Sequence, residues 1–194
     1  KPLITAGAVD AGILSYETKI DCENGTYNAP RGGRISDHGH SYGVISVAEG
    51  VVVSSNICMA KIGEKLGNDQ IHEMVRRFGF GQPTGIELPG ETGGIVRPLN
   101  RWDGYSLRRV PFGQEISAST IQLAMAFSVL ANGGLLMKPS LVDEIYDAEG
   151  NLLYQAQPEV VRRVISPQVA RQTLDVMQQV VERGTGKNCI MKQW

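Results

Sequence analysis

The sequence predicts an α+β fold in which helices dominate and strands are few. Two Ser-x-x-Glu/Gln patterns, at Ser46 and Ser119, each precede an apolar run, as expected of capped helix starts. The run 121–134 is apolar on nearly every side, which predicts a helix buried in the middle of a domain. Clear strand signals are limited, with one hairpin expected over 139–155. At 194 residues, the chain is one globular domain or a large part of one.

The first element is expected to be a helix over residues 1–12. Pro2 suits its first turn and Gly12 suits its end. Residues 13–45 are rich in Gly, Asn, Asp and Ser, so they predict a long irregular segment with short strands near 18–22 and 33–36. Loops of this length in compact domains are often functional.

Ser46 and Glu49 form a capping-box pattern, which predicts a short helix that ends near Val53. A second helix is expected from about Asn56 to Leu66, and Gly67 is expected to end it before a third helix follows.

Residues 78–94 contain six Gly and two Pro, so this stretch is expected to form loops and turns. The central apolar helix should follow Ser119 and close at Asn132-Gly133, and a last helix should begin at Ser166-Pro167. The visible amphipathic faces are too few to surround the central helix. We therefore expect that a sheet outside this chain completes the core.

Composition and charge exclude several classes of function. The formal net charge is −1 and basic residues are scattered, so nucleic acid is not an expected partner, and Arg108-Arg109 is expected to be solvated surface. No apolar run approaches the roughly 20 residues that span a bilayer. Cys22, Cys58 and Cys189 form no Cys-x-x-Cys pair, so no metal site is expected, and Cys58 reads as a small buried hydrophobe.

Three small polar residues, Ser54-Ser55-Asn56, interrupt an otherwise apolar stretch. Ser and Asn are preferred helix N-caps, so the local pattern alone favours a capping role. If Ser54 and Asn56 instead act together on one ligand, they must lie on the turn between two helices, because residues i and i+2 of a helix point to different sides. Both interpretations remain open at this level.

The chain resembles the transpeptidase domain of class B penicillin-binding proteins over nearly its whole length. Six stretches in order carry the resemblance: KPLITAGAVDAG (1–12), DCENGTY (21–27), ISDHGHSYGVISVAEGVVVSSN (35–56), FGFGQPTGIELPGETGG (78–94), PFGQEISASTIQLAMAFSVLANGG (111–134) and VVERGTGKN (180–188). The motif set of these enzymes is S-x-x-K, S-D-N and K-T-G. Here the second motif reads Ser-Ser-Asn, and the third is absent from the sequence.

The resemblance implies roles for three residues. Lys1 would be the Lys of S-x-x-K and the general base, which requires a lowered pKa, and the nucleophilic Ser would lie three residues before it, outside the chain. Ser54 would relay a proton between Lys1 and the leaving amine. Asn56 would orient Lys1 and hold a substrate amide, while Ser55 is expected to point away from the site.

Other polar residues are expected to be structural. His38 and His40 are interpreted as exposed loop residues rather than metal ligands or catalysts, and Glu115 as a buried or capping carboxylate rather than an acid catalyst.

The family resemblance further implies that residues 1–194 are a partial transpeptidase domain. They would be the mostly helical subdomain of the penicillin-binding protein and serine β-lactamase-like fold, with most of its central sheet missing. The parent would be a serine-type D,D-transpeptidase that cross-links peptidoglycan stem peptides through an acyl-serine and binds β-lactams, without a cofactor. The fragment alone would be inactive.

By the same resemblance, the parent would act outside the cytoplasm, anchored in the membrane by a segment beyond this chain, with divisome or elongasome proteins as possible partners. Two alternatives stay open: a β-lactam sensor or class D-like β-lactamase on the same fold, and an inactive scaffold relative.

Overall fold

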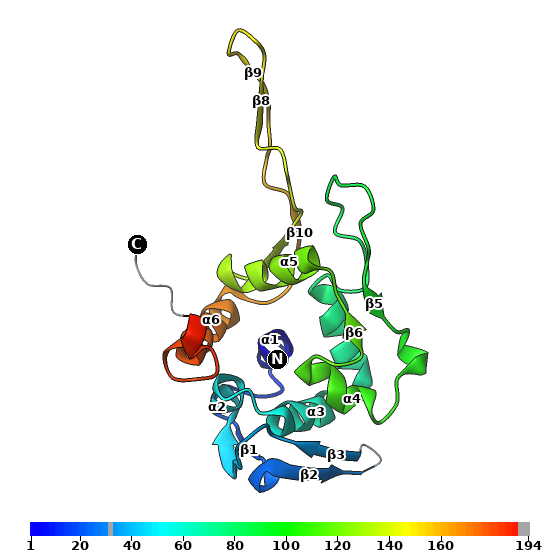
Figure 1. The fold of residues 1–194 in the computed structure, drawn as a ribbon, viewed down its shortest axis with the longest axis vertical. Helices are drawn as coiled ribbons and strands as arrows, with labels where there is room; N and C mark the ends of the chain where they lie inside the picture. The colour runs from blue at the N-terminus through cyan, green and yellow to red at the C-terminus, as the bar shows by residue number, and fades with distance from the viewer. Residues whose placement is uncertain (31–32, 190–194) are drawn as a thin grey trace.

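The structure is a computed structural model that describes residues 1–30 and 33–189. Six α-helices dominate it, and Figure 1 looks nearly along α1, which lies at the centre with the other helices arranged around it. The helices are α1 (Pro2–Asp10), α2 (Val47–Val52), α3 (Asn56–Arg77), α4 (Ser106–Arg109), α5 (Thr120–Ala131) and α6 (Pro167–Glu182).

The strands pair only two by two. Among the described residues the five antiparallel pairs join into no larger sheet: β1 (Lys19–Asp21) with β4 (Val44–Ser46), β2 (Thr26–Ala29) with β3 (Gly33–Ser36), β5 (Ile95–Val96) with β6 (Ile116–Ser117), β7 (Leu135–Met137) with β10 (Val160–Arg163), and β8 (Glu144–Tyr146) with β9 (Leu152–Gln155). The α+β prediction with few strands is confirmed. The predicted hairpin is β8–β9, which projects away from the helical body (Figure 1).

The central helix α1 begins as the sequence predicts, with Pro2 in its first turn. Its residues 3–8 are all buried, and Gly7 faces Met74 of α3 so closely that a Cβ at Gly7 would lie 2.8 Å from the Met74 sulfur. The label α3 covers two helical segments that meet at a kink at Gly67, whose φ of 77° is left-handed. The predicted break is therefore confirmed. The contact of Gly7 with Met74 holds the second half of α1 against the last turns of α3, while the Thr5 hydroxyl, which donates to the Met59 sulfur at 3.6 Å, holds α1 against the first turn of α3.

Helix α5 carries the reciprocal capping box that the sequence predicts, between Ser119 and Gln122. One face of α5 is uncovered, since Leu123 is 45% exposed and Phe127 is 41% exposed, which agrees with the expectation that the residues of this chain do not surround the helix. An apolar groove of about 310 Å³ lies between this face and α1, with Leu3 and Phe80 in its wall. Ile116 of the β5–β6 pair also lines it, and the described residues form no sheet of more than two strands.

The burial of the three cysteines and of Arg108 can be compared with what the sequence predicts. Cys22 and Cys58 are completely buried free thiols, which confirms the prediction for Cys58, and Cys189 is exposed at the end of the short 3-10 turn η4 (Lys187–Cys189). Arg108 corrects the expectation of a solvated pair, because it is only 8% exposed and its Nε donates to Glu64 at 2.5 Å. Across the described helices, none combines the length and the apolar character that a bilayer crossing demands.

Candidate active site

The turn between α2 and α3 answers why Ser54-Ser55-Asn56 interrupts the apolar run. The Ser54 N–H donates to the Val51 carbonyl (3.1 Å) and the Ser55 N–H donates to the Gly50 carbonyl (2.9 Å). This pair of bonds is the Schellman motif that closes a helix, and Ser54 occupies its left-handed position with φ 59°. Glycine usually takes that position, since an L-residue there costs roughly 1–2 kcal/mol. A serine in this conformation needs a reason beyond helix termination.

Ser55 is the N-cap of α3. Its hydroxyl accepts from the Cys58 N–H (3.0 Å) and donates to Asp37 Oδ2 (2.8 Å), and the residue is 1% exposed. The other carboxylate oxygen of Asp37 accepts from the backbone N–H groups of Asn56 (2.6 Å) and Ile57 (3.1 Å). The cap is therefore Ser55 with Asp37, not Ser54 or Asn56. The expectation that Ser55 points away from the Lys1 site is confirmed.

Ser54 and Asn56 instead hold the side chain of Lys1, which arrives from the start of α1. The Lys1 ammonium donates to the Ser54 hydroxyl at 2.8 Å, to Asn56 Oδ1 at 2.7 Å and to the Ser54 carbonyl at 2.5 Å. Asn56 Nδ2 donates to the Ser36 carbonyl at 3.2 Å, which fixes its amide orientation. The three residues named by the family resemblance thus meet at one point, although 53 residues separate Lys1 from Ser54.

The electrostatic setting of Lys1 suits a base. Partial burial lowers the pKa of the Lys1 side chain below its usual value, because desolvation penalises the charged amine. The negative charge of Asp37 acts against this shift by favouring the ammonium form. The net effect is a lysine that gives up its proton more readily than a solvated one.

These groups line a cleft of about 710 Å³. His38, His40 and Thr185 lie in its walls, and both histidines are exposed as expected. Within residues 1–30 and 33–189, no group of His, Cys, Asp and Glu side chains is arranged to hold a metal.

Glu49 does not complete the predicted capping box. Its carboxylate accepts instead from Arg183 at 2.6 and 3.0 Å, while only the Ser46 hydroxyl caps α2.

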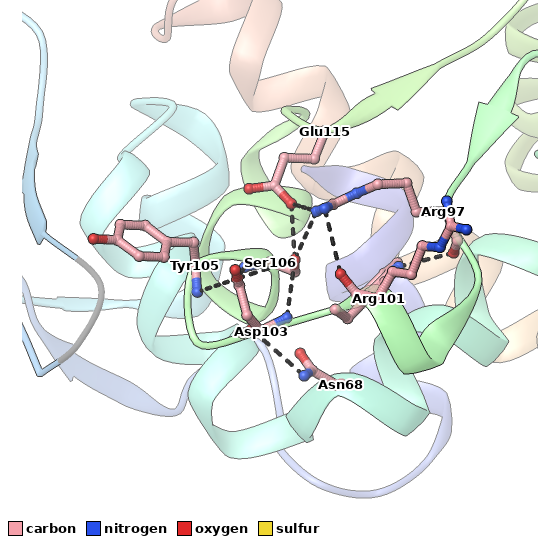
Figure 2. Close-up of polar contacts among 8 residues, drawn as sticks. Asn68, Arg97, Arg101, Asp103, Tyr105, Ser106 and Glu115 are labelled. Carbon is pink, nitrogen blue, oxygen red and sulfur yellow. Dashed lines mark hydrogen bonds and ion pairs between the residues drawn. The ribbon is translucent and has the colours of Figure 1, made fainter.

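Glu115 is a half-buried structural carboxylate, as predicted. Figure 2 shows Arg97 and Ser106 converging on it, and both donate to Glu115 Oε2, Ser106 at 2.8 Å. Glu115 has φ 64°, so these bonds hold a non-glycine residue in the left-handed region. Asp103 completes the cluster by accepting from the Tyr105 and Ser106 N–H groups, which lowers the pKa of the Asp103 carboxyl. The cluster braces the loop between α4 and α5.

Two residues of the site escaped the sequence reasoning. Asp37 lies in a polar, glycine-rich loop, and only its position before the Ser-Ser-Asn turn, 18 residues ahead of Ser55, hinted at a role. Arg183 offered no local signal, because its partner Glu49 is 134 residues away.

Replacing Ser55 by Ala is expected to lower the free energy of unfolding by about 0.5–2 kcal/mol, because α3 loses its N-cap. Its effect on chemistry in the complete domain should be small, since the hydroxyl faces Asp37 and not Lys1. Chemical denaturation and the rate of acylation by a fluorescent penicillin measure the two effects. A loss of rate above about a hundredfold with unchanged stability would contradict this division of roles.

The family model described as "Penicillin binding protein transpeptidase domain" matches residues 1–193. Among curated relatives, Penicillin-binding protein PbpB of Mycolicibacterium smegmatis is 34% identical over 130 residues, which are 67% of this chain and 20% of the relative. Stage V sporulation protein D of Bacillus subtilis is 34% identical over 152 residues, which are 78% of this chain and 24% of the relative. The chain therefore spans about a fifth to a quarter of the length of these relatives.

Solved structures agree with this match. The transpeptidase domain of Burkholderia pseudomallei penicillin-binding protein 3 superposes with a TM-score of 0.86 at 27% identity, over 98% of this chain and 55% of that one. Penicillin-binding protein 3 of Mycobacterium tuberculosis, solved with aztreonam, superposes with a TM-score of 0.85 at 25% identity, over 98% of this chain and 44% of that one. With the family model covering nearly every residue, the chain belongs to the penicillin-binding protein transpeptidase family.

Proposed function

We propose that this chain is part of a class B D,D-transpeptidase domain whose parent cross-links peptidoglycan stem peptides through an acyl-serine intermediate. Relatives of this chain are named peptidoglycan D,D-transpeptidases, and a structural neighbour was solved with aztreonam bound. The parent would act outside the cytoplasm, tethered to the membrane, where its substrate lies. Lys1, Ser54 and Asn56 would form its proton-transfer site, with the nucleophilic Ser three residues before Lys1.

The observation that carries this proposal is the set of acceptors around the Lys1 amine. An ammonium has three donors, and three oxygens receive them: the Ser54 carbonyl, the Ser54 hydroxyl and the Asn56 amide oxygen. When Lys1 is neutral, it has two donors and one lone pair. Only the Ser54 hydroxyl can then reverse its bond and donate, because the two carbonyl oxygens carry no proton.

This asymmetry gives each residue a role. Neutral Lys1 takes the proton of the nucleophilic Ser as that oxygen attacks the substrate carbonyl. The proton then passes from Lys1 through the Ser54 hydroxyl to the nitrogen of the departing D-alanine, so the scissile C–N bond breaks as the acyl-serine forms. Asn56 holds Lys1 in line through Oδ1, at 2.7 Å. In the second half, the incoming amine attacks the acyl-serine and returns its proton by the same path.

The test is acylation of the complete domain by a fluorescent penicillin, followed by mass mapping of the labelled peptide. We expect a single labelled Ser three residues before Lys1 and a long-lived adduct. An adduct that hydrolyses within seconds would assign the domain to the β-lactamases instead. Absence of any adduct in a folded domain would leave the inactive scaffold.

A further inference from the structure

A second cavity lies against the far side of Asn56. It is an open groove of about 360 Å³ between β3 and the loop that follows α4, and its lining includes Asn56, Arg34, Arg109 and Gln114. Because Asn56 also lines the cleft that holds Lys1, the groove continues the cleft past the proton-transfer site.

The two arginines are available to a ligand. In the part of the chain that the structure describes, no carboxylate pairs with Arg34 or Arg109, whereas Arg97, Arg108 and Arg183 each have a carboxylate partner. The guanidinium of Arg109 stacks on the ring of Tyr105, 4.9 Å from its centroid. Tyr105 in turn lies against Gly33, the residue before Arg34, at 3.6 Å from the position of a Cβ there. This contact brings the two walls of the groove together.

The wall that carries Arg109 and Gln114 is rigidly supported. The Glu115 cluster of Figure 2 ties the start of α4 to the residue that follows Gln114, through Ser106 and Arg97. The Gln114 N–H also donates to the Arg109 carbonyl at 3.1 Å. The groove thus presents two guanidinium groups and an amide side chain, with Arg109 and Gln114 on the braced wall and Arg34 on β3, a donor set suited to a carboxylate.

We propose that this groove is a subsite for a side-chain carboxylate of the donor stem peptide, with Arg34 and Arg109 as its specificity-determining residues. The inference rests on the proposed transpeptidase function. If Asn56 holds a backbone amide of the donor, the neighbouring residues of the same peptide extend along the groove. The acid side chain of a residue upstream of the scissile bond then meets the two arginines.

The test uses the complete domain and two donor peptides that end in D-Ala-D-Ala and differ only in one upstream side chain, a carboxylate or its primary amide. We expect kcat/KM for acylation, measured without acceptor, to favour the carboxylate peptide by about tenfold, since two charge-assisted bonds form in a partly open groove. In Arg34→Gln and Arg109→Gln this preference should fall toward one, mainly through KM. Arg171→Gln, which changes an arginine on α6 that pairs with Asp175, should keep the full preference.

Each result decides the proposal. The amide peptide measured in the same variant is the internal reference, so general damage to folding lowers both rates and leaves their ratio unchanged. Equal rates for the two peptides in the unchanged domain, or a preference seen only when acceptor is added, would overturn the donor subsite. Penicillin labelling of the unchanged domain is read separately, and its absence would instead overturn the proposed function.

Discussion

Replacing Ser54 by Gly in the complete domain is expected to slow acylation by about 10²–10³-fold, the usual cost of one lost hydrogen bond in a preorganised site. The same change should leave the free energy of unfolding unchanged or raise it by up to about 1 kcal/mol, because glycine relieves the left-handed backbone at this position. A rate loss without a stability loss would separate chemistry from helix capping in one variant.

Two further variants sharpen this result. Asn56→Ala should lower the rate to a similar extent, because Lys1 loses the acceptor at Oδ1. Ser54→Ala removes the same hydroxyl as Ser54→Gly but keeps a Cβ at φ 59°, so it should match the rate loss without the gain in stability. The measurements are labelling by a fluorescent penicillin and thermal melting of each variant. Small, equal rate effects at positions 54, 55 and 56 would contradict a role in proton transfer and would indicate that the whole turn serves only to cap helices.

Replacing Asp37 by Asn is expected to shift the acid limb of the acylation rate profile to lower pH. The base must be neutral to act, and the Asp37 carboxylate favours the charged form of Lys1. Removing that charge lowers the pKa of Lys1 further, so a larger fraction is neutral at a given pH. Stability should also fall, by about 1–3 kcal/mol, because the charged acceptor at the N-terminus of α3 is lost.

Asp103→Asn is the matched control for this change. Asp103 also accepts two backbone N–H bonds at a helix start, yet it is not among the groups that shift the pKa of Lys1. It should cost stability without moving the acid limb. A shift of the Asp37→Asn profile toward higher pH, or equal profiles for both variants, would contradict the electrostatic role of Asp37.

The sequence predicts the local features of this fold well. The helix starts at Pro2, Ser119 and Ser166 and the break at Gly67 appear where their local patterns place them. Each depends on residues within one or two turns, so the necessary information is contiguous in the chain.

Features that depend on distant partners were missed. Arg108 appeared solvated because Glu64, its partner, is 44 residues away, and Glu49 left its expected capping box for Arg183. The exposed face of α5 could not be assigned from the sequence, because a helix that is apolar all round has no polar stripe to mark the face that points away from the core.

The candidate site was predicted in part, since its residues could be named from the sequence but their contacts could not. Lys1, Ser54 and Asn56 were named from a motif, and only the coordinates show that their side chains meet. Local pattern could not decide between capping and contact with Lys1 at Ser54-Ser55-Asn56, since Ser55 caps α3 while Ser54 and Asn56 accept from Lys1. The left-handed φ of Ser54 distinguishes this residue from the helix cap at Ser55, and a serine in the sequence does not predict such a φ.

The distribution of thiols gives the chain a natural attachment point for a spectroscopic reporter. Of its three cysteines, only Cys189 is exposed, and it shares the turn η4 with Lys187, which lies in the wall of the cleft. A maleimide dye sensitive to local polarity would therefore couple there and leave the buried Cys22 and Cys58 unmodified. In the complete domain its emission would follow occupancy of the cleft in real time, so that the proposed binding of unlabelled β-lactams could be tested in a stopped-flow instrument without a fluorescent drug.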